Sequence, residues 1–317
     1  MTPGRYATPA AFRRALTDRL KEEAQRSPWN LQQLQRQVAY DRLIERLYLI
    51  DDGWIVKGAT ALLAREVGVR GSLDVDLYRA EAREVAEAEL REAAATDVGD
   101  WFRFEIGVGS PISNNAVRVQ VKSVIGATTW VEFHVDLVGT DVRMTGQPED
   151  VPPLARGVIP DIKQRGYRAY PLADHVADKV AATYERHGER NMPSTRFRDL
   201  VDLVAIVTGA SVRADAQLRA LASEFERRGL ALPERFDVPD RPLWETGYAA
   251  EARRSILDTA QTLDEALEVV RAFADPLFGG TAIGGWDPGA LQWRSEPRPK
   301  QVNAKMPIRR SHLSRGP

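Results

Sequence analysis

Two aspartates in one predicted strand are the residues of this chain best suited to chemistry. The run 73–78 alternates apolar and polar side chains, so Asp74 and Asp76 share one face of the strand. Two carboxylates at this spacing can hold divalent cations, and the two negative charges repel each other when no cation is bound. Gly71 and Ser72 come directly before them, where small residues let a phosphate approach the backbone. The stretch therefore predicts a site for a metal and a nucleotide.

A third aspartate lies in a later predicted strand. Segment 131–137 also alternates and places Asp136 on its polar face beside His134, which we interpret as a neighbour and not as a metal ligand. If the two strands are neighbours, Asp74, Asp76 and Asp136 converge as a two-metal site for phosphoryl chemistry. The alternative is that all three are solvated side chains on half-buried strands. The preceding Gly-Ser favours the metal site for the first pair and leaves Asp136 open.

Further candidates for phosphate binding lie just upstream and in a later helical region. Lys57, Gly58 and Thr60 stand between a short predicted strand and a helix, whose N-terminus attracts anions, although Thr60 could equally be only a helix cap. Lys179 flanks the apolar stripe of a predicted helix and could reach a phosphate or lie on the surface.

A second predicted helix adds two acids to this set. Asp199 and Asp202 are three residues apart and share one helical face. One of them could orient Lys179 or act as a base, and the other could be an ordinary surface acid or a partner of Arg198. The residues alone do not decide between the two acids.

Two blocks of the chain resemble the AbiEii/AbiGii-type nucleotidyltransferases, which include the MenT-like toxins. The first block is Lys57-Gly58-Ala59-Thr60-Ala61-Leu62 followed by Ser72-x-Asp74-x-Asp76-Leu77, and the second is Lys179 followed by Arg198-Asp199-x-x-Asp202-Leu203. Ala59 replaces the family's usual second glycine, which is the smallest possible change. The insertion 190–195 leaves the choice between Asp199 and Asp202 open. The resemblance spans about residues 40 to 210.

The resemblance implies a fold, an activity and partners. The fold is α+β, with a polymerase-beta-like nucleotidyltransferase core of mixed sheet and helices, followed by a C-terminal helical domain. The activity is Mg²⁺-dependent transfer, with two ions, of a nucleotide from an NTP to the 3′ end of tRNA, which blocks translation. The chain would be the toxin of a type IV toxin–antitoxin pair, with a cognate antitoxin that acts directly or through transcription. A protein or small-molecule acceptor, or a nucleotide-binding regulator without turnover, are the alternatives.

The predicted elements that position these residues fall into three regions. The first region, 1–48, is a helical hairpin made of helices near 9–24 and 30–47. It packs on the second region, a core at 49–165. The third region, 166–317, is a helical domain with a basic tail. We expect 139–160 to be loop and 230–248 to be irregular. Trp286 and Trp293 could stack on RNA beside the basic tail, or could simply pack.

Composition excludes several classes of protein. The chain has 317 residues, a formal net charge of −1 and no cysteine, so disulfides, thiolate metal sites and cysteine nucleophiles are absent. The N-terminus has no apolar core typical of a signal peptide, and no apolar run is long enough to cross a membrane. We therefore expect a cytoplasmic monomer.

Overall fold

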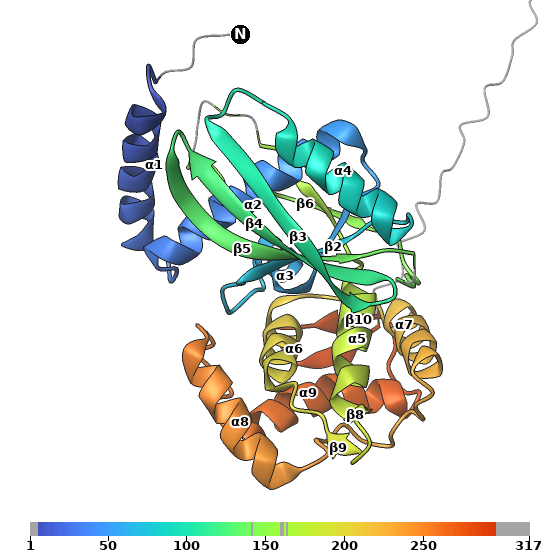
Figure 1. Ribbon diagram of the computed structural model, residues 1–317. Helices are drawn as coiled ribbons and strands as arrows, with labels where there is room; N and C mark the ends of the chain where they lie inside the picture. The colour runs from blue at the N-terminus through green and yellow to red at the C-terminus, as the bar shows by residue number, and fades with distance from the viewer. Residues whose placement is uncertain (1–5, 141, 159–161, 163, 296–317) are drawn as a thin grey trace, which may run out of the picture.

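The computed structural model describes residues 6–140, 142–158, 162 and 164–295, and the basic tail predicted at the C-terminus lies almost wholly outside these residues. The chain forms a sheet-containing lobe and, below it in Figure 1, a helical lobe. The helices are α1 (Pro9–Ala24), α2 (Leu31–Ile50), α3 (Gly58–Ala64), α4 (Arg83–Ala95), α5 (Leu172–Tyr184), α6 (Phe197–Gly209), α7 (Ala214–Arg227), α8 (Arg241–Arg254) and α9 (Leu263–Phe278). The strands are β1 (Ile55–Lys57), β2 (Asp74–Tyr78), β3 (Phe102–Ser113), β4 (Ala116–Ile125), β5 (Thr128–Val138), β6 (Glu149–Val151), β7 (Tyr167–Ala169), β8 (Arg186–His187), β9 (Met192–Pro193), β10 (Gly285–Asp287) and β11 (Gln292–Arg294).

The main sheet is mixed and has β2 at its centre. Its strand order is β3-β4-β5-β2-β1-β7-β6, with β2 parallel to β5, β1 parallel to β7, and every other pair antiparallel. Val75 and Leu77 are fully buried on one face of β2, as the alternation predicts. Leu73 is an exception at 62% exposure, because pairing with β5 starts only at Asp74. The polar face of β2 is turned towards the helical lobe.

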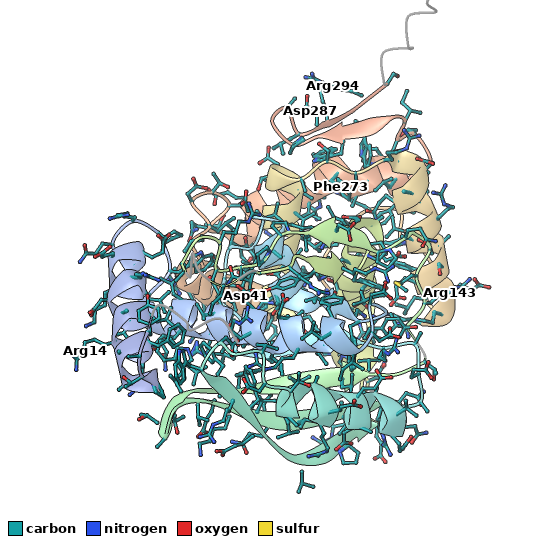
Figure 2. The ribbon with its side chains drawn as sticks, turned by 90° about the horizontal axis from the view of Figure 1, so that it is seen from above. Arg14, Asp41, Arg143, Phe273, Asp287 and Arg294 are labelled. Atoms are coloured by element: carbon teal, nitrogen blue, oxygen red, sulfur yellow. The ribbon has the colours of Figure 1, made fainter. Side chains whose placement is uncertain are left out.

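Three helices cover the apolar face of the sheet. Thr8 caps α1 through its side chain, and Asn30 and Gln33 form a reciprocal capping box at the start of α2. Both predicted helices of the N-terminal hairpin are confirmed, and with α4 they share one hydrophobic core with the strands. Figure 2 shows α2 passing across the middle of the molecule, with Asp41 near its centre.

A buried ion-pair cluster links Arg42 and Arg46 of α2 to Asp100, just before β3. Asp100 is 1% exposed and accepts hydrogen bonds from Arg42 Nε at 2.5 Å and Arg46 Nη2 at 2.7 Å. Burial by itself raises the pKa of Asp100, but Arg46 and Arg42 outweigh burial, and the pKa lies below its ordinary value. The carboxylate therefore stays charged inside the core.

A second hydrophobic core fills the helical lobe. It unites α5 to α9, and Leu62 of α3 joins it from the other lobe. The indole of Trp286 donates to Val207 O at 2.7 Å, and that of Trp293 donates to Phe273 O at 2.9 Å. Figure 2 places Phe273 beneath the β10–β11 hairpin. Both tryptophans therefore pack on the helices, as one of the two expected alternatives has it; Trp286 is buried and Trp293 is half-buried, and RNA stacking by Trp293 stays a prediction.

Several local expectations were wrong. The expected loop 139–160 contains β6, and β7 follows at 167–169. Both strands are three residues long, too short to show a period. The expected irregular region 230–248 includes the first half of α8, where Pro242 occupies the first turn and costs no hydrogen bond.

The predicted division at residues 48 and 165 stays a prediction. The structure does show that Ala169 is the last residue along the chain in the first hydrophobic core, and that the buried residues of the second, apart from Leu62, come from Leu172 onward. None of the helices in the described ranges has both the length and the apolar character needed to span a membrane.

Candidate active site

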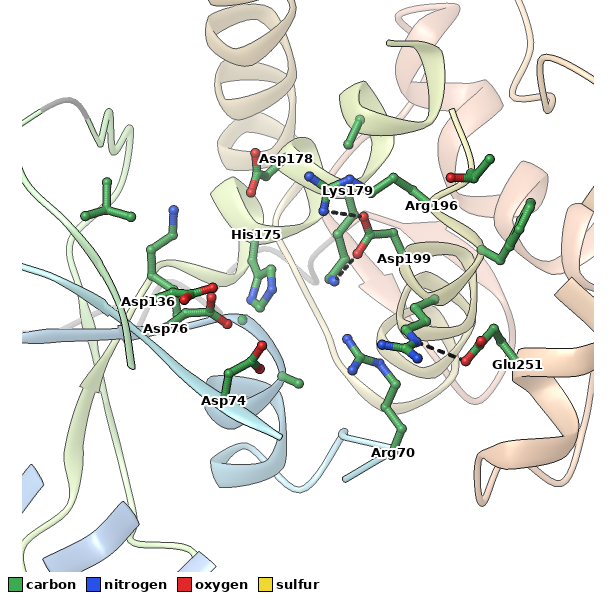
Figure 3. A pocket seen from close by; sticks show the side chains of 18 of the residues that line it. Arg70, Asp74, Asp76, Asp136, His175, Asp178, Lys179, Arg196, Asp199 and Glu251 are labelled. Carbon is green, nitrogen blue, oxygen red and sulfur yellow. Dashed lines mark hydrogen bonds and ion pairs between the residues drawn. The ribbon is translucent and has the colours of Figure 1, made fainter. Parts of the chain in front are cut away.

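A pocket of about 660 Å³ opens at the seam between the two lobes. Figure 3 shows Asp74, Asp76 and Asp136 on one side, Lys179 and Asp199 on the other. Of the side chains that line it, seven are Lys or Arg and six are Asp or Glu. The charged residues are Lys57, Arg70, Asp74, Asp76, Arg118, Asp136, Asp178, Lys179, Arg196, Arg198, Asp199, Arg228 and Glu251. Such a mixed lining is suited to an anion that arrives together with a cation.

The three predicted aspartates do lie together. In the sheet register Asp76 stands opposite Asp136 on β5, and Asp74 stands opposite His134. Burial, and next the charges of Asp74 and Asp136, raise the pKa of Asp76 to about 6. Strand pairing therefore brings like charges together, and a bound cation would relieve the repulsion.

The donor set fits a cation held by two carboxylates. In the described part of the chain, no three His, Asp or Glu side chains are grouped closely enough to hold a metal by themselves. Mg²⁺ typically takes one or two protein carboxylates and completes its shell with water and substrate phosphate. Asp74 and Asp76, side by side at the pocket wall, provide such a pair.

Ser72 and Thr60 support the acids from behind. Ser72 Oγ lies 3.0 Å from Asp74 Oδ1 and 2.7 Å from Asp74 O, and Thr60 Oγ1 donates to Asp74 O at 3.3 Å. Both side chains are at least 95% buried, and neither they nor Gly71 line the pocket. Thr60 is also not the cap of α3, since Lys57 occupies that position. The geometry shows these hydroxyls orienting Asp74.

Lys57 and Gly58 do line the pocket. Gly58 has φ +60°, and a Cβ at this position would lie 1.7 Å from Asp76 Oδ2. Lys57 Nζ stands 4.2 Å from the centre of the Tyr170 ring, in cation–π contact. The glycine is thus required both by its backbone conformation and by the acid beside it.

Lys179 is held by both of the later aspartates. Its Nζ donates to Asp199 Oδ1 at 2.8 Å and to Asp202 Oδ2 at 2.7 Å. Burial by itself lowers the pKa of Lys179, but Asp199 and Asp202 outweigh burial and hold the pKa above its ordinary value. Lys179 is therefore a charged, buried cation and not a surface lysine.

The two acids differ in where they lie. Asp199 lines the pocket, whereas Asp202 is 1% exposed behind it and also accepts two hydrogen bonds from Arg70, at 2.9 and 2.8 Å. Burial by itself raises the pKa of Asp202, but Lys179 and Arg70 lower it to about 2. Asp202 thus ties Lys179 to the chain segment that leads into Gly71 and β2.

A second pocket of about 450 Å³ adjoins the first. The two pockets share Lys57, Val138 and Asp178 as lining residues. Arg143 and Arg227 add positive charge to the second pocket, as Figure 2 shows for Arg143 beside α7. The second pocket, which we call the groove, extends from these shared residues to Ser113, Asn114 and Asn115 at the turn between β3 and β4.

Comparison with known proteins identifies the family of this chain. Residues 42–273 match the family model described as nucleotidyl transferase AbiEii toxin, type IV TA system. The chain belongs to the AbiEii nucleotidyltransferase toxin family. No curated protein matches it. Among solved structures it is similar to the MenT4 nucleotidyltransferase toxin of Mycobacterium tuberculosis (16% identity, 84% of this chain and 98% of that one, TM-score 0.49) and to JHP933 of Helicobacter pylori (14%, 78% and 93%, 0.45).

The family membership and the architecture confirm the expected fold class of this AbiEii-family chain. It is α+β, with a mixed sheet and helices in the nucleotidyltransferase lobe and helices in the C-terminal part. It is a nucleotidyltransferase of the toxin type, and its family implies an antitoxin as partner.

Sequence reasoning missed several residues of the AbiEii-family pocket. His175 on α5 is 3% exposed and its Nδ1 has no hydrogen-bond partner among the described residues; burial, and then the charge of Lys179, hold its pKa well below the ordinary value. Figure 3 shows it between Asp76 and Lys179. Asp178, which pairs with Arg228, was detectable as the direct neighbour of Lys179. No sequence pattern indicates Arg118, because it meets Asp136 only through the pairing of β4 with β5.

Proposed function

We propose that this chain transfers a nucleotide from an NTP to the 3′-hydroxyl of an RNA, with the 3′ end of tRNA as the first candidate acceptor. The observation that supports this most is the meeting of Asp74 and Asp76 with Lys57 and Lys179 in one pocket at the lobe seam. Paired carboxylates beside fixed cations are the arrangement that phosphoryl transfer from a triphosphate needs.

In the proposed reaction, the acceptor's 3′-oxygen forms a bond to the α-phosphorus of the NTP. The bond from that phosphorus to the α,β-bridging oxygen breaks, pyrophosphate leaves with the electron pair, and the hydroxyl proton passes to solvent. The products are RNA longer by one nucleotide, pyrophosphate and a proton. The catalytic task of the protein is to position the two reactants and to balance the charge on the triphosphate.

The chain's own residues divide this work. Asp74 and Asp76 would hold Mg²⁺, which when bound neutralises triphosphate oxygens and polarises the reacting groups. Ser72 fixes the carboxylate of Asp74. Lys179 uses two of its three N–H donors on Asp199 and Asp202, so one donor is left for a phosphate oxygen.

The groove of the second pocket is where we place the acceptor strand. Lys57, Arg143 and Arg227 line it together with Asp178 and Glu224, and this excess of cations over acids suits the phosphates of a single strand. Addition of nucleotides to the tRNA 3′ end would prevent aminoacylation and stop translation, which accounts for toxicity. The cognate antitoxin would prevent this, by direct contact or by control of transcription.

The test is transfer of label from each of four α-³²P NTPs to total tRNA and to lysate protein. We expect label in tRNA with the wild type, and a loss of roughly 100-fold or more in Asp74→Asn, because a ligand of the cation is removed. Glu132→Gln, an exposed acid on the polar face of β5, is the matched control and should keep full activity. Label in protein alone would move the proposal to a protein acceptor. If no NTP gave pyrophosphate release, the remaining interpretation would be a nucleotide-binding regulator without turnover.

A further inference from the structure

Asp136, which the sequence suggests as a third metal ligand, already has a cation. Arg118 Nε donates to Asp136 Oδ1 at 2.7 Å and Arg118 Nη2 donates to Oδ2 at 2.5 Å, so the pair is bidentate. The same Nη2 lies 3.9 Å from Asp74 Oδ2. The guanidinium therefore binds Asp136 and lies close to Asp74 as well.

The pairing of strands β4 and β5 places Arg118 beside Asp136. In the β4–β5 register Arg118 is directly opposite Asp136, and Asp136 is directly opposite Asp76 on β2. Cross-strand partners point to the same face, so these three side chains form one row across the sheet. The row carries two negative charges and one positive charge before any ligand binds.

The two aspartates of β2 lack such a close partner among the described residues. Asp76 has no ion pair within 4 Å among the described residues, and Asp74 has only the long contact to Arg118. The local negative charge that attracts a divalent ion is thus concentrated on Asp74 and Asp76. An arginine stays protonated at any working pH, so it is a permanent substitute for a cation.

We propose that Arg118 takes the place of a second divalent cation, and that the site holds one divalent ion on Asp74 and Asp76 with Asp136 reserved for the guanidinium. The proposal rests on the proposed function for its chemistry, but its geometry is independent of which acceptor is used. It departs from the two-ion arrangement that the sequence suggests. Arg118 is then a positioning residue, which fixes Asp136 and adds positive charge beside the triphosphate.

The experiment counts Mn²⁺ bound per chain by calorimetry and by the electron paramagnetic resonance signal of free Mn²⁺, with a non-hydrolysable NTP analogue present. The full chain should bind one Mn²⁺. Asp136→Asn should leave the number and the affinity unchanged within about threefold, whereas loss of a true ligand would weaken binding by roughly 10–100-fold. A second Mn²⁺ in the wild type, or weakened binding in Asp136→Asn, overturns the proposal.

A second pair of variants tests the guanidinium itself. Arg118→Gln releases Asp136 beside Asp76, so we expect a second Mn²⁺ to bind, and the double variant with Asp136→Asn should return to one. Lys122→Gln, four residues along the same face of β4 and paired with Glu105, is the matched control and should bind one ion. If Arg118→Gln still binds only one ion, Arg118 does not occupy the second position.

These readouts separate this proposal from the proposed function. Mn²⁺ counting requires no acceptor and no turnover, so a failure to label RNA leaves the count interpretable. If Arg118→Gln does not fold, Arg118→Lys keeps the charge and should bind one ion, and the result for Asp136→Asn decides alone. Asp74→Asn should lose most of the Mn²⁺ affinity under either outcome.

Discussion

At the scale of one residue, the geometry of the site allows only glycine at position 58. Its backbone has φ +60°, and the place of its missing Cβ is already taken by the carboxylate of Asp76. Two separate penalties therefore act on any larger residue: backbone strain in the left-handed region, and displacement of the Asp76 carboxylate.

Gly58→Ala separates these two penalties when compared with Gly99→Ala. Gly99 has φ +73°, and a Cβ added there would meet no described atom within 4 Å, so alanine adds strain alone, about 1 kcal/mol in the free energy of unfolding. We expect Gly58→Ala to lose transfer activity by roughly 100-fold, since a shift of about 1 Å in a reacting group has that cost. Urea unfolding and the transfer assay measure the two effects. Equal activity in the two variants would contradict the role given to Gly58.

The residues of the site divide into those that local pattern reveals and those that it does not. Strict alternation is enough to put Asp74 and Asp76 on one face, because the period of a strand is a local property. The partner of Asp136 is not local: Arg118 is 18 residues away and meets it only through the register of two strands. Ser72 was predicted for phosphate, yet the fold turns its hydroxyl towards Asp74.

At the scale of elements, long amphipathic helices were predictable. Of the three-residue strands in the main sheet, β1 was predicted from the helix that follows it, but β6 and β7 were not. α1, α2, α5 and α6 follow from apolar spacing and end signals such as Thr8 and Asn30. β6 and β7 were missed because three residues carry no usable period, and their pairing depends on the tertiary structure. The start of α8 was missed because Pro242 resembles a breaker when it is not yet known to be in a first turn.

The link between α2 and the segment after β6 should depend on pH. Asp41 is 3% exposed, and its carboxylate accepts hydrogen bonds from Leu154 N at 3.0 Å and Ala155 N at 2.8 Å. Burial raises the pKa of Asp41 to about 7, although those two hydrogen bonds and Arg42 oppose the shift and Glu45 adds to it.

The sign of the effect follows from proton counting. Between about pH 4 and pH 7 the folded chain keeps a proton on Asp41 that the unfolded chain has released, so stability falls as pH rises through this window. Asp41→Asn cannot ionise, so we expect it to lose less stability than the wild type, with a difference on the order of 2 kcal/mol between pH 5 and pH 8. Urea unfolding at both pH values measures it. Parallel pH profiles for the two proteins would show that Asp41 does not titrate in this range.

At the scale of the whole molecule, the site exists only because two hydrophobic cores meet at a seam. The sheet lobe supplies Asp74 and Asp76, and the helical lobe supplies Lys179 and Asp199. Asp202 joins the lobes by binding Lys179 and Arg70 together. The sequence indicated each half from its own pattern, but the distance between the halves is a property of the assembled fold.

The groove in which we place the acceptor is the second pocket, next to this seam. Val138 lies two residues beyond Asp136 on β5, which corresponds to about 7 Å along a strand, and it lines both pockets. A strand whose last nucleotide occupies the second pocket would therefore have its 3′-hydroxyl within reach of the aspartates. Arg143 and Arg227 line the second pocket and not the first, and we place the preceding phosphates beside them.

Removal of those two charges should weaken RNA binding without affecting the NTP. For Arg143→Gln with Arg227→Gln we expect KM for RNA to rise by about tenfold and the slope of log Kd against log salt to fall by about 1.4, or 0.7 per lost phosphate contact on a single strand. KM for the NTP should not change, because neither residue lines the first pocket. Arg219→Gln, an exposed arginine on α7 that pairs with Asp215, is the control and should leave both constants unchanged. An equal rise in both KM values would mean that the groove belongs to the nucleotide site and not to the acceptor.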